Sequence, residues 1–210
     1  MTERDDEPLV SRGFRGRRPA AGHRLPPGQY ETHDFPVLAA GPTPHTPLTE
    51  WDFTVRGPDG ASARWSWAEL QALPRETPTV DIHCVTTWSK FGTQWEGVSV
   101  DTLLALAEQK GVRRAEYVLA FADGGYTTNV LLSDVTSGKA WVAFGYAGAP
   151  LEPVHGGPAR LLIPHLYFWK SAKWVRGLQL ADEDRPGFWE QLGYHDRGDP
   201  WKEQRYRGDP

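Results

Sequence analysis

Apolar residues occur in short runs that end at glycine or proline, and this pattern excludes a fold built on long helices. The 210 residues include 22 Gly and 18 Pro, which interrupt every long apolar stretch. Apolar and polar side chains alternate over 51–56 before a turn at 58–60, which predicts a strand followed by a turn. The runs on either side of 123–125 are expected to pair as a hairpin. Further strands are expected over 80–84, 117–122, 127–132, 140–146, 160–163 and 173–180.

Two short helices are predicted between these strands. Ser66 lies three residues before Glu69, which is the spacing of a capping box, and Pro74 ends the segment. Leucines at helical spacing over 100–110 precede Gly111, a residue suited to the C-terminal cap of a helix. Many short strands with few short helices indicate the α+β class, with mixed and mostly antiparallel sheets.

The composition excludes several classes of function. The chain has 23 Lys and Arg against 27 Asp and Glu, a formal net charge of -4 at pH 7, so nucleic acid is not expected as a partner. Cys84 is the single cysteine, which excludes an internal disulfide, a zinc site made of cysteines alone and a four-cysteine iron–sulfur cluster. An unpaired thiol is typical of a reducing compartment.

The N-terminal segment predicts neither export nor a membrane span. Arg17 and Arg18 are followed by Pro and Gly rather than by an apolar stretch, which argues against twin-arginine export. No apolar run approaches the roughly 20 residues that cross a bilayer, so no transmembrane segment and a cytoplasmic location are expected. The predicted organisation is a partly disordered N-terminal arm over 1–29, followed by one domain over 30–210.

Cys84 lies at the end of the predicted strand over 80–84, ahead of a polar and aromatic segment at 85–93. Loops at strand ends are common places for functional sites, so 85–93 is predicted to be a loop that lines a pocket. The thiol itself has two interpretations, a small buried apolar residue or a functional group. His83 is an unsuitable base for Cys84, because adjacent strand residues point to opposite faces.

A second candidate segment is the glycine-rich and basic run over 155–174. Its glycines allow close approach of the backbone to a ligand, and Arg160, Lys170 and Lys173 supply positive charge for an anion such as a phosphate. The alternative interpretation is a solvated basic loop. Four tryptophans flank the two segments: Trp88, Trp95, Trp169 and Trp174. Each is interpreted first as a core residue, and the alternative interpretation is that they form walls of the pocket.

The order and spacing of three elements resemble the molybdopterin domain of the sulfite oxidase family. The similarity is greatest to short bacterial members, which are related to the catalytic subunit of periplasmic methionine-sulfoxide reductase. It extends over about residue 12 to the C-terminus and includes 35–44, where Ala39 and Ala40 stand in place of polar side chains of relatives. The three elements are the Cys84 segment over 81–98, Tyr126 at the start of a strand, and the spaced residues His155, Arg160, Ser171 and Lys173.

This resemblance implies a cofactor and a set of site residues. Cys84 matches the thiolate that ligates molybdenum beside the two dithiolene sulfurs of one molybdopterin, so Mo-molybdopterin is the implied cofactor. Tyr126 matches a tyrosine on the substrate side, and Lys90 is the basic residue that this segment offers where sulfite oxidases carry arginine. We assign Tyr126 and Lys90, with Cys84, to the catalytic set. The residues implied to contact the pterin and its phosphate are His155, Arg160, Ser171, Ala172 and Lys173.

The implied function is a molybdenum-dependent oxidoreductase that transfers an oxygen atom to or from a small-molecule substrate in a two-electron reaction. Sulfoxide reduction is favoured over sulfite oxidation, because the arginines of a sulfite pocket are missing. Electrons are expected to pass through a separate partner protein, and a monomer is expected because the family's dimerisation domain is missing. Two alternatives stay open: a non-catalytic module that binds molybdopterin or another anion, and a thiol-dependent hydrolase that uses Cys84.

Overall fold

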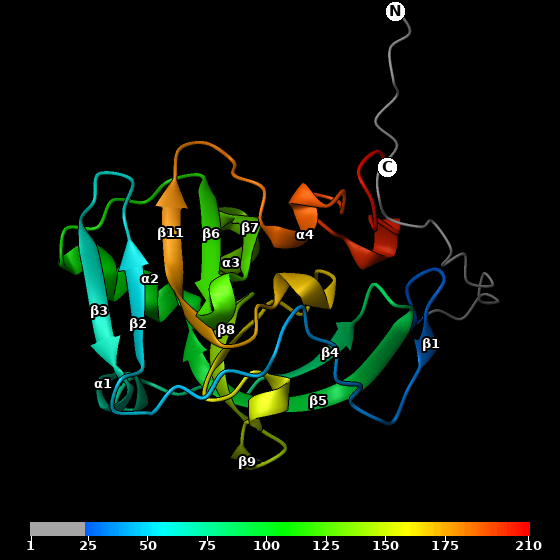
Figure 1. Cartoon of the computed structure of the whole chain (residues 1–210), viewed down its shortest axis with the longest axis horizontal. Coiled ribbons are helices and arrows are strands. Elements are labelled where there is room, and N and C mark those ends of the chain that lie inside the picture. Colours follow the sequence, from blue (N-terminus) through cyan, green and yellow to red (C-terminus); the bar gives the residue numbers. More distant parts are fainter. Residues whose placement is uncertain (1–23) are drawn as a thin grey trace, which may run out of the picture.

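The computed structural model describes residues 24–210, and Figure 1 shows two sheets with short helices between and around them. Residues 1–23 of the predicted arm lie outside the described residues. Residues 24–29 lie on the domain, where Gln29 is buried and its Nε2 donates to the carbonyl oxygen of Cys84 at 3.1 Å. The structure contains, within 24–210, no helix that is both long and apolar enough to cross a bilayer.

Five strands form the first sheet: β2 (Asp52–Arg56), β3 (Ser62–Ser66), β6 (Tyr117–Ala122), β7 (Thr127–Leu131) and β11 (Val175–Ala181). Their order is β3-β2-β11-β6-β7. β11 runs parallel to β2, and the other neighbours are antiparallel. The predicted hairpin is confirmed, because β6 pairs with β7 across the turn at 123–125.

Six strands form the second sheet: β1 (Tyr30–Glu31), β4 (Thr79–His83), β5 (Trp88–Ser99), β8 (Trp141–Tyr146), β9 (Ala149–Pro150) and β10 (Arg160–Leu162). The path β1-β5-β8-β10 carries β4 on β5 and β9 on β8. β1 is parallel to β5, and the remaining pairs are antiparallel. The prediction of mixed, mostly antiparallel sheets is therefore confirmed.

The helices are short, as the glycine and proline pattern predicts. The α-helices are α1 (Trp67–Gln71), α2 (Val100–Gln109), α3 (Leu132–Val135) and α4 (Phe188–Gln191). The 3₁₀ helices are η1 (Asp123–Gly125), η2 (Pro153–His155), η3 (Phe168–Lys170) and η4 (Pro200–Lys202). The predicted capping box is present at α1: Ser66 Oγ accepts from Glu69 N at 3.4 Å, and Glu69 Oε2 accepts from Ser66 N at 2.7 Å. Such a cap stabilises a helix by about 1 kcal/mol.

Two clusters of buried apolar side chains hold these elements together. The larger one joins the two sheets through α2, whose Leu103 and Leu104 pack with Phe53 of β2 and Val98 of β5. The smaller one surrounds Cys84 and consists largely of aromatic and aliphatic residues of β5, β8, β10 and η3. Cys84 is therefore held by the packing of four elements rather than by a mobile loop.

The segment 85–93 differs from the predicted loop, because most of it belongs to β5. The turn between β4 and β5 is short and is closed by a hydrogen bond from Cys84 N to Trp88 O at 2.8 Å. From Trp88 onward the chain pairs with β4 as an antiparallel strand, since its aromatic and β-branched residues favour a pleated, half-buried surface. The residues of this segment that line a cavity are consequently those at its beginning.

Candidate active site

One cavity of about 550 Å³ lies between the Cys84 turn, the turn at 123–126 and the basic run. The segment over 35–44, which forms neither helix nor strand, and residues in and after α4 complete its walls. The two candidate segments therefore meet in space, although they are distant in sequence. The predicted site residues that line the cavity together are Cys84, Tyr126, Arg160, Ser171, Ala172 and Lys173.

Cys84 is buried where β4 turns into β5. It is 7% exposed, and its Sγ lies 3.1 Å from Thr86 Oγ1 in a hydrogen bond. Burial raises the pKa of the Cys84 thiol, so the thiol is protonated at neutral pH and a metal ion has to displace its proton. Within residues 24–210 no group of three or more His, Cys, Asp and Glu side chains is placed to hold a metal ion.

His83, the neighbour of Cys84, makes its contact elsewhere. Its Nδ1 lies 2.8 Å from Ser89 Oγ in a buried hydrogen bond. Burial lowers the pKa of His83 to about 4, so the imidazole is neutral at pH 7. The hydrolase alternative loses support, because the Cys84 thiol is protonated and His83 is bonded to another side chain.

Arg160 is a buried cation in the cavity wall, and main-chain carbonyls are its hydrogen-bond partners. It is 1% exposed; Nη1 donates to His155 O at 2.8 Å and Nη2 donates to Ser171 O at 2.7 Å. Its Nε is buried and has no hydrogen-bond partner among the described residues. Burial lowers the pKa of Arg160 to about 9, which reflects the cost of a positive charge at this place. An anionic ligand in the cavity offsets that cost.

Lys173 adds a second cation to the same wall. Its Nζ donates to Val154 O at 2.7 Å, and burial, assisted by the charge of Arg160, lowers the pKa of Lys173 to about 8. Ser171 Oγ accepts from Ile163 N at 2.8 Å, which leaves its hydroxyl hydrogen to be donated to a ligand. Two cations and a hydroxyl donor form a set suited to a phosphate group.

His155 lies behind this wall. Its ring stacks on Phe35, with centroids 3.9 Å apart and planes 7° apart, and Phe35 lines the cavity. Burial lowers the pKa of His155, with Lys173 and Arg160 as further causes, so the ring is neutral at pH 7. His155 is not among the residues that line the cavity; it supports Arg160 through its carbonyl and Phe35 through its ring.

Inorganic phosphate is expected to stabilise the cofactor-free protein more at pH 7 than at about pH 9.5. The pKa of Lys173 is about 8 in the folded protein and 10.5 ordinarily. As pH rises between these two values, Lys173 is deprotonated in the folded protein and still protonated in the unfolded chain. The free energy of unfolding contributed by Lys173 therefore increases over this pH range. The attraction of Lys173 for phosphate decreases over the same range, because the side chain loses its positive charge. The shift in melting temperature caused by phosphate, measured by scanning fluorimetry, checks this expectation. Lys173→Met is expected to show a smaller shift with a weaker pH dependence, and an unchanged shift contradicts the assignment.

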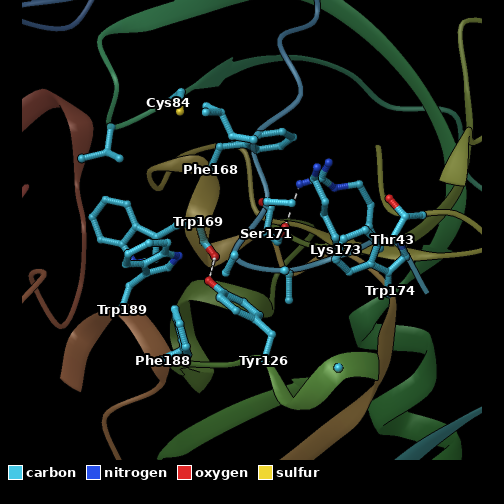
Figure 2. A pocket seen from close by; sticks show the side chains of 18 of the residues that line it. Thr43, Cys84, Tyr126, Phe168, Trp169, Ser171, Lys173, Trp174, Phe188 and Trp189 are labelled. Carbon is cyan, nitrogen blue, oxygen red and sulfur yellow. Dashed lines mark hydrogen bonds between the residues drawn. The ribbon is translucent and has the colours of Figure 1, made fainter. Parts of the chain in front are cut away.

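Five aromatic side chains form the other end of the cavity, and we call them the aromatic wall: Tyr126, Trp169, Phe188, Trp189 and Tyr194. Figure 2 shows four of them on the side of the view that holds Cys84, with Lys173 and Trp174 on the other side. Tyr126 Oη donates to Trp169 O at 2.7 Å. Burial raises the pKa of Tyr126 well above its ordinary value, so the phenol stays neutral.

Besides His155, three further residues singled out in the sequence do not line the cavity. Lys90 donates its Nζ to His33 O from a position on β5, so the structure does not bring it to the predicted site. Lys170 is fully buried and lies 2.7 Å from Glu190 Oε1, which corrects its interpretation as a cation for an anionic ligand. Trp95 belongs to the smaller core cluster, in agreement with its first interpretation as a core residue.

Sequence reasoning did not select the part of the aromatic wall contributed by Phe188, Trp189 and Tyr194. The signal available was a concentration of aromatic residues over 188–194 after a Pro-Gly pair. α4 has only four residues, too short for an amphipathic pattern that would show which face it buries.

Comparison with known families matches the part of the chain that builds this site. The family model described as oxidoreductase molybdopterin binding domain matches residues 40–189, a span that contains Cys84, Tyr126 and the whole basic run. The uncharacterized oxidoreductase YuiH of Bacillus subtilis is 45% identical over 188 residues, which cover 89% of this chain and 93% of YuiH.

More distant relatives share the same region. The protein-methionine-sulfoxide reductase catalytic subunit MsrP of Gluconobacter oxydans is 24% identical over 210 residues, covering 80% of this chain and 67% of MsrP. The crystal structure of the sulfane dehydrogenase SoxCD of Paracoccus pantotrophus is 20% identical and has a TM-score of 0.57, covering 67% of this chain and 40% of that chain. This likeness shows a shared fold of the sulfite oxidase type. The chain therefore belongs to the molybdopterin-binding oxidoreductases, and it is an enzyme whose cofactor is molybdopterin.

Proposed function

We propose that this enzyme reduces a small neutral sulfoxide to a thioether, with molybdenum held by molybdopterin and electrons from a separate donor protein. The balance of the reaction is one sulfoxide, two electrons and two protons giving one thioether and one water. The distribution of charge in the cavity carries the proposal: its lining cations within 24–210 are Arg160 and Lys173, and the aromatic wall is uncharged. An oxyanion such as sulfite needs positive charge at its own binding place, whereas a neutral sulfoxide does not.

The residues of the cavity fit the cofactor. Arg160 and Lys173 are cations whose burial is offset by an anion, and Ser171 has a hydroxyl hydrogen to donate. Cys84 would hold the metal, since a soft thiolate suits a sulfur-rich shell. When bound, the cofactor supplies two-electron oxygen-atom transfer at molybdenum.

The protein's own share is to place the substrate and to exclude water. The aromatic wall and the apolar segment over 35–44 form most of the surface away from the cations. Tyr126 is a neutral phenol whose hydrogen is donated to Trp169 O, so its oxygen can accept a hydrogen bond without adding charge to the site. A neutral, largely apolar lining favours substrates that lose little hydration on entry.

The relatives support both parts of the proposal. MsrP is by name a protein-methionine-sulfoxide reductase and a catalytic subunit, so a related chain acts on sulfoxides together with a further subunit. At 24% identity this likeness supports the reaction class and leaves the substrate of the present enzyme to be tested directly.

The test uses the holoenzyme, with molybdenum and pterin content determined beforehand. Reduced viologen serves as electron donor for methyl phenyl sulfoxide and dimethyl sulfoxide, and ferricyanide serves as acceptor for sulfite. We expect one thioether for every two electrons consumed. Sulfite oxidation without sulfoxide reduction contradicts the proposal. Fully loaded protein that performs neither reaction contradicts it as well and favours the binding-module alternative.

A further inference from the structure

The aromatic wall is one continuous surface of rings in contact. Trp169 and Trp189 each lie 5.1 Å from Tyr194 between ring centroids, and Phe188 lies 5.1 Å from Trp189 and 5.9 Å from Tyr126. The planes of successive rings are inclined by 43° to 86°, so edges and faces alternate. Phe188 is 38% exposed, so the surface reaches the solvent at this ring.

Two polar atoms of this wall, on Tyr126 and on Trp169, donate their hydrogens to groups of the protein itself. Tyr126 Oη donates to Trp169 O at 2.7 Å, and Trp169 Nε1 donates to Glu190 Oε1 at 2.9 Å. The wall consists mainly of ring faces and edges, and rings of this kind prefer edge-to-face or offset contact with another flat apolar group. An anionic group finds no positive charge on these five residues.

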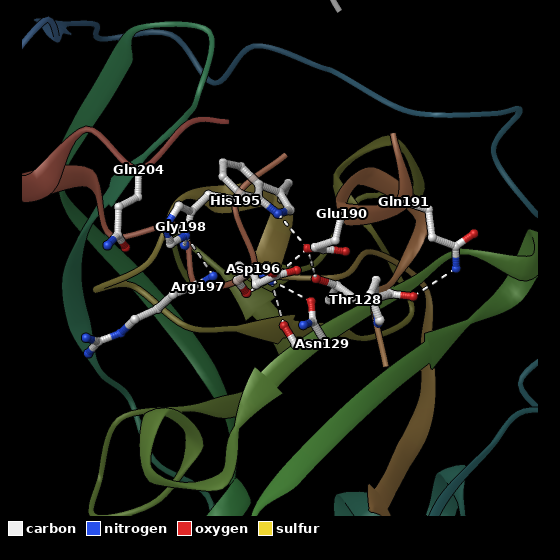
Figure 3. Close-up of polar contacts among 12 residues, drawn as sticks. Thr128, Asn129, Glu190, Gln191, His195, Asp196, Arg197, Gly198 and Gln204 are labelled. Atoms are coloured by element: carbon white, nitrogen blue, oxygen red, sulfur yellow. Dashed lines mark hydrogen bonds and ion pairs between the residues drawn. The ribbon is translucent and has the colours of Figure 1, made fainter. Parts of the chain in front are cut away.

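A buried ion pair between Lys170 and Glu190 holds the two halves of the wall together. Figure 3 shows Glu190 of this pair close to Thr128. Glu190 Oε1 accepts from Trp169 Nε1 at 2.9 Å and from Thr128 Oγ1 at 2.9 Å, and it lies 2.7 Å from Lys170 Nζ. Lys170 Nζ also donates to Asn129 O at 2.7 Å. Both charged side chains are fully buried. One carboxylate thus ties η3, which carries Trp169, to α4, which carries Phe188 and Trp189.

The burial of both charges makes this pair weak evidence for a contribution to stability. Replacing a buried ion pair by apolar residues of similar size is often neutral or stabilising. Our hypothesis is that this pair fixes one defined arrangement of side chains, a role that buried ion pairs have in some proteins. The ion pair fixes the position of Trp169 relative to α4 through the hydrogen bond between Trp169 and Glu190.

We infer that the aromatic wall is the subsite for an aryl or similarly flat apolar substituent of the substrate, and that Glu190 is its positioning residue. The inference rests on the proposed function for the identity of the reacting group, a sulfoxide. It adds the class of substituent, which the wall selects by ring contact rather than by charge.

The first experiment compares wild-type holoenzyme with Trp189→Ala. The ratio of kcat/KM for methyl phenyl sulfoxide to that for dimethyl sulfoxide is expected to fall about tenfold, the size of one lost aromatic contact. Trp201→Ala is the matched control, because Trp201 is 49% exposed and is not among the cavity-lining residues. An unchanged ratio in Trp189→Ala overturns the inference.

A binding measurement separates failure of the inference from failure of the proposed function. Methyl phenyl sulfone keeps the aryl group, and its Kd for the holoenzyme is measured by calorimetry. Trp189→Ala is expected to weaken this binding about tenfold, and Trp201→Ala is expected to leave it unchanged. Sulfone binding that depends on Trp189, without any sulfoxide turnover, supports the subsite and contradicts the proposed reaction. Equal binding by all three proteins overturns the subsite.

Two neutral double variants test the positioning role of Glu190. Lys170→Met with Glu190→Gln keeps an acceptor for Trp169 Nε1, whereas Lys170→Met with Glu190→Leu removes it. Both avoid an unpaired buried charge. We expect the aryl preference to fall several-fold only in the leucine variant, with equal pterin content in both proteins. An equal aryl preference in both variants assigns the pair a merely structural role and overturns this part of the inference.

Discussion

Replacing Cys84 by serine is expected to reduce turnover by more than about 100-fold. Mutation of a residue that only hydrogen-bonds to a metal ligand already lowers activity about 10- to 100-fold, and Cys84 is expected to be a ligand itself. A serine oxygen is a poor ligand for a metal in a sulfur-rich shell. The fold is expected to persist, since serine is smaller than cysteine and can keep the hydrogen bond to Thr86. Molybdenum by elemental mass spectrometry, pterin by fluorescence of its oxidised product and the melting temperature check these expectations.

Two results distinguish loss of a ligand from loss of structure. Cys84→Ser should melt within a few degrees of the wild type and should lose the absorption band that arises from charge transfer between thiolate and metal. A Cys84→Ser protein that retains most of its turnover shows that the thiolate is not a metal ligand here.

Arg160→Met is expected to reduce the pterin content of the purified protein about 10- to 100-fold, the equivalent of one charge-assisted hydrogen bond of roughly 1.5–3 kcal/mol. The cofactor-free protein should lose less than about 2 kcal/mol of unfolding free energy. The reason is that the substitution removes two hydrogen bonds to main-chain carbonyls but also the cost of burying a charge, which lowers the pKa of Arg160 to about 9.

The measurement needs two expression hosts. Protein from a host that does not make molybdopterin gives the unfolding free energy by denaturant titration, and protein from a competent host gives the pterin content. Arg64→Met is the control, because Arg64 is an exposed residue of β3 paired with Asp52. A variant at Arg160 that keeps its pterin yet loses much stability identifies the guanidinium as a structural group alone.

Local signals predicted the parts of the fold that depend on near neighbours in sequence. The capping box joins Ser66 to Glu69, three positions away, and the hairpin closes between Phe121 and Thr127. Both depend on residues that are close in sequence, so short-range chemistry determines them. Cys84 and Arg160 were recognised by residue type and spacing, and the structure places both in one cavity.

The remaining features depend on contacts between distant segments. Lys170 reads as a solvated or ligand-binding cation, and only the fold shows that Glu190 pairs with it inside the protein. The neutral ring of His155 lies behind Phe35, a residue 120 positions earlier. Nothing near these residues in sequence indicates which partner they meet, because tertiary packing decides it.

The buried, protonated state of Cys84 also determines how the protein endures oxidants before it receives its cofactor. Peroxide and disulfides react with thiolates, and reaction rates follow thiolate content and access. Cys84 is 7% exposed, and burial raises its pKa, so the cofactor-free protein keeps very little of the reactive form. We therefore expect this single sulfur to form sulfenic and sulfinic acid more slowly than an exposed thiol does in the interval between folding and cofactor loading.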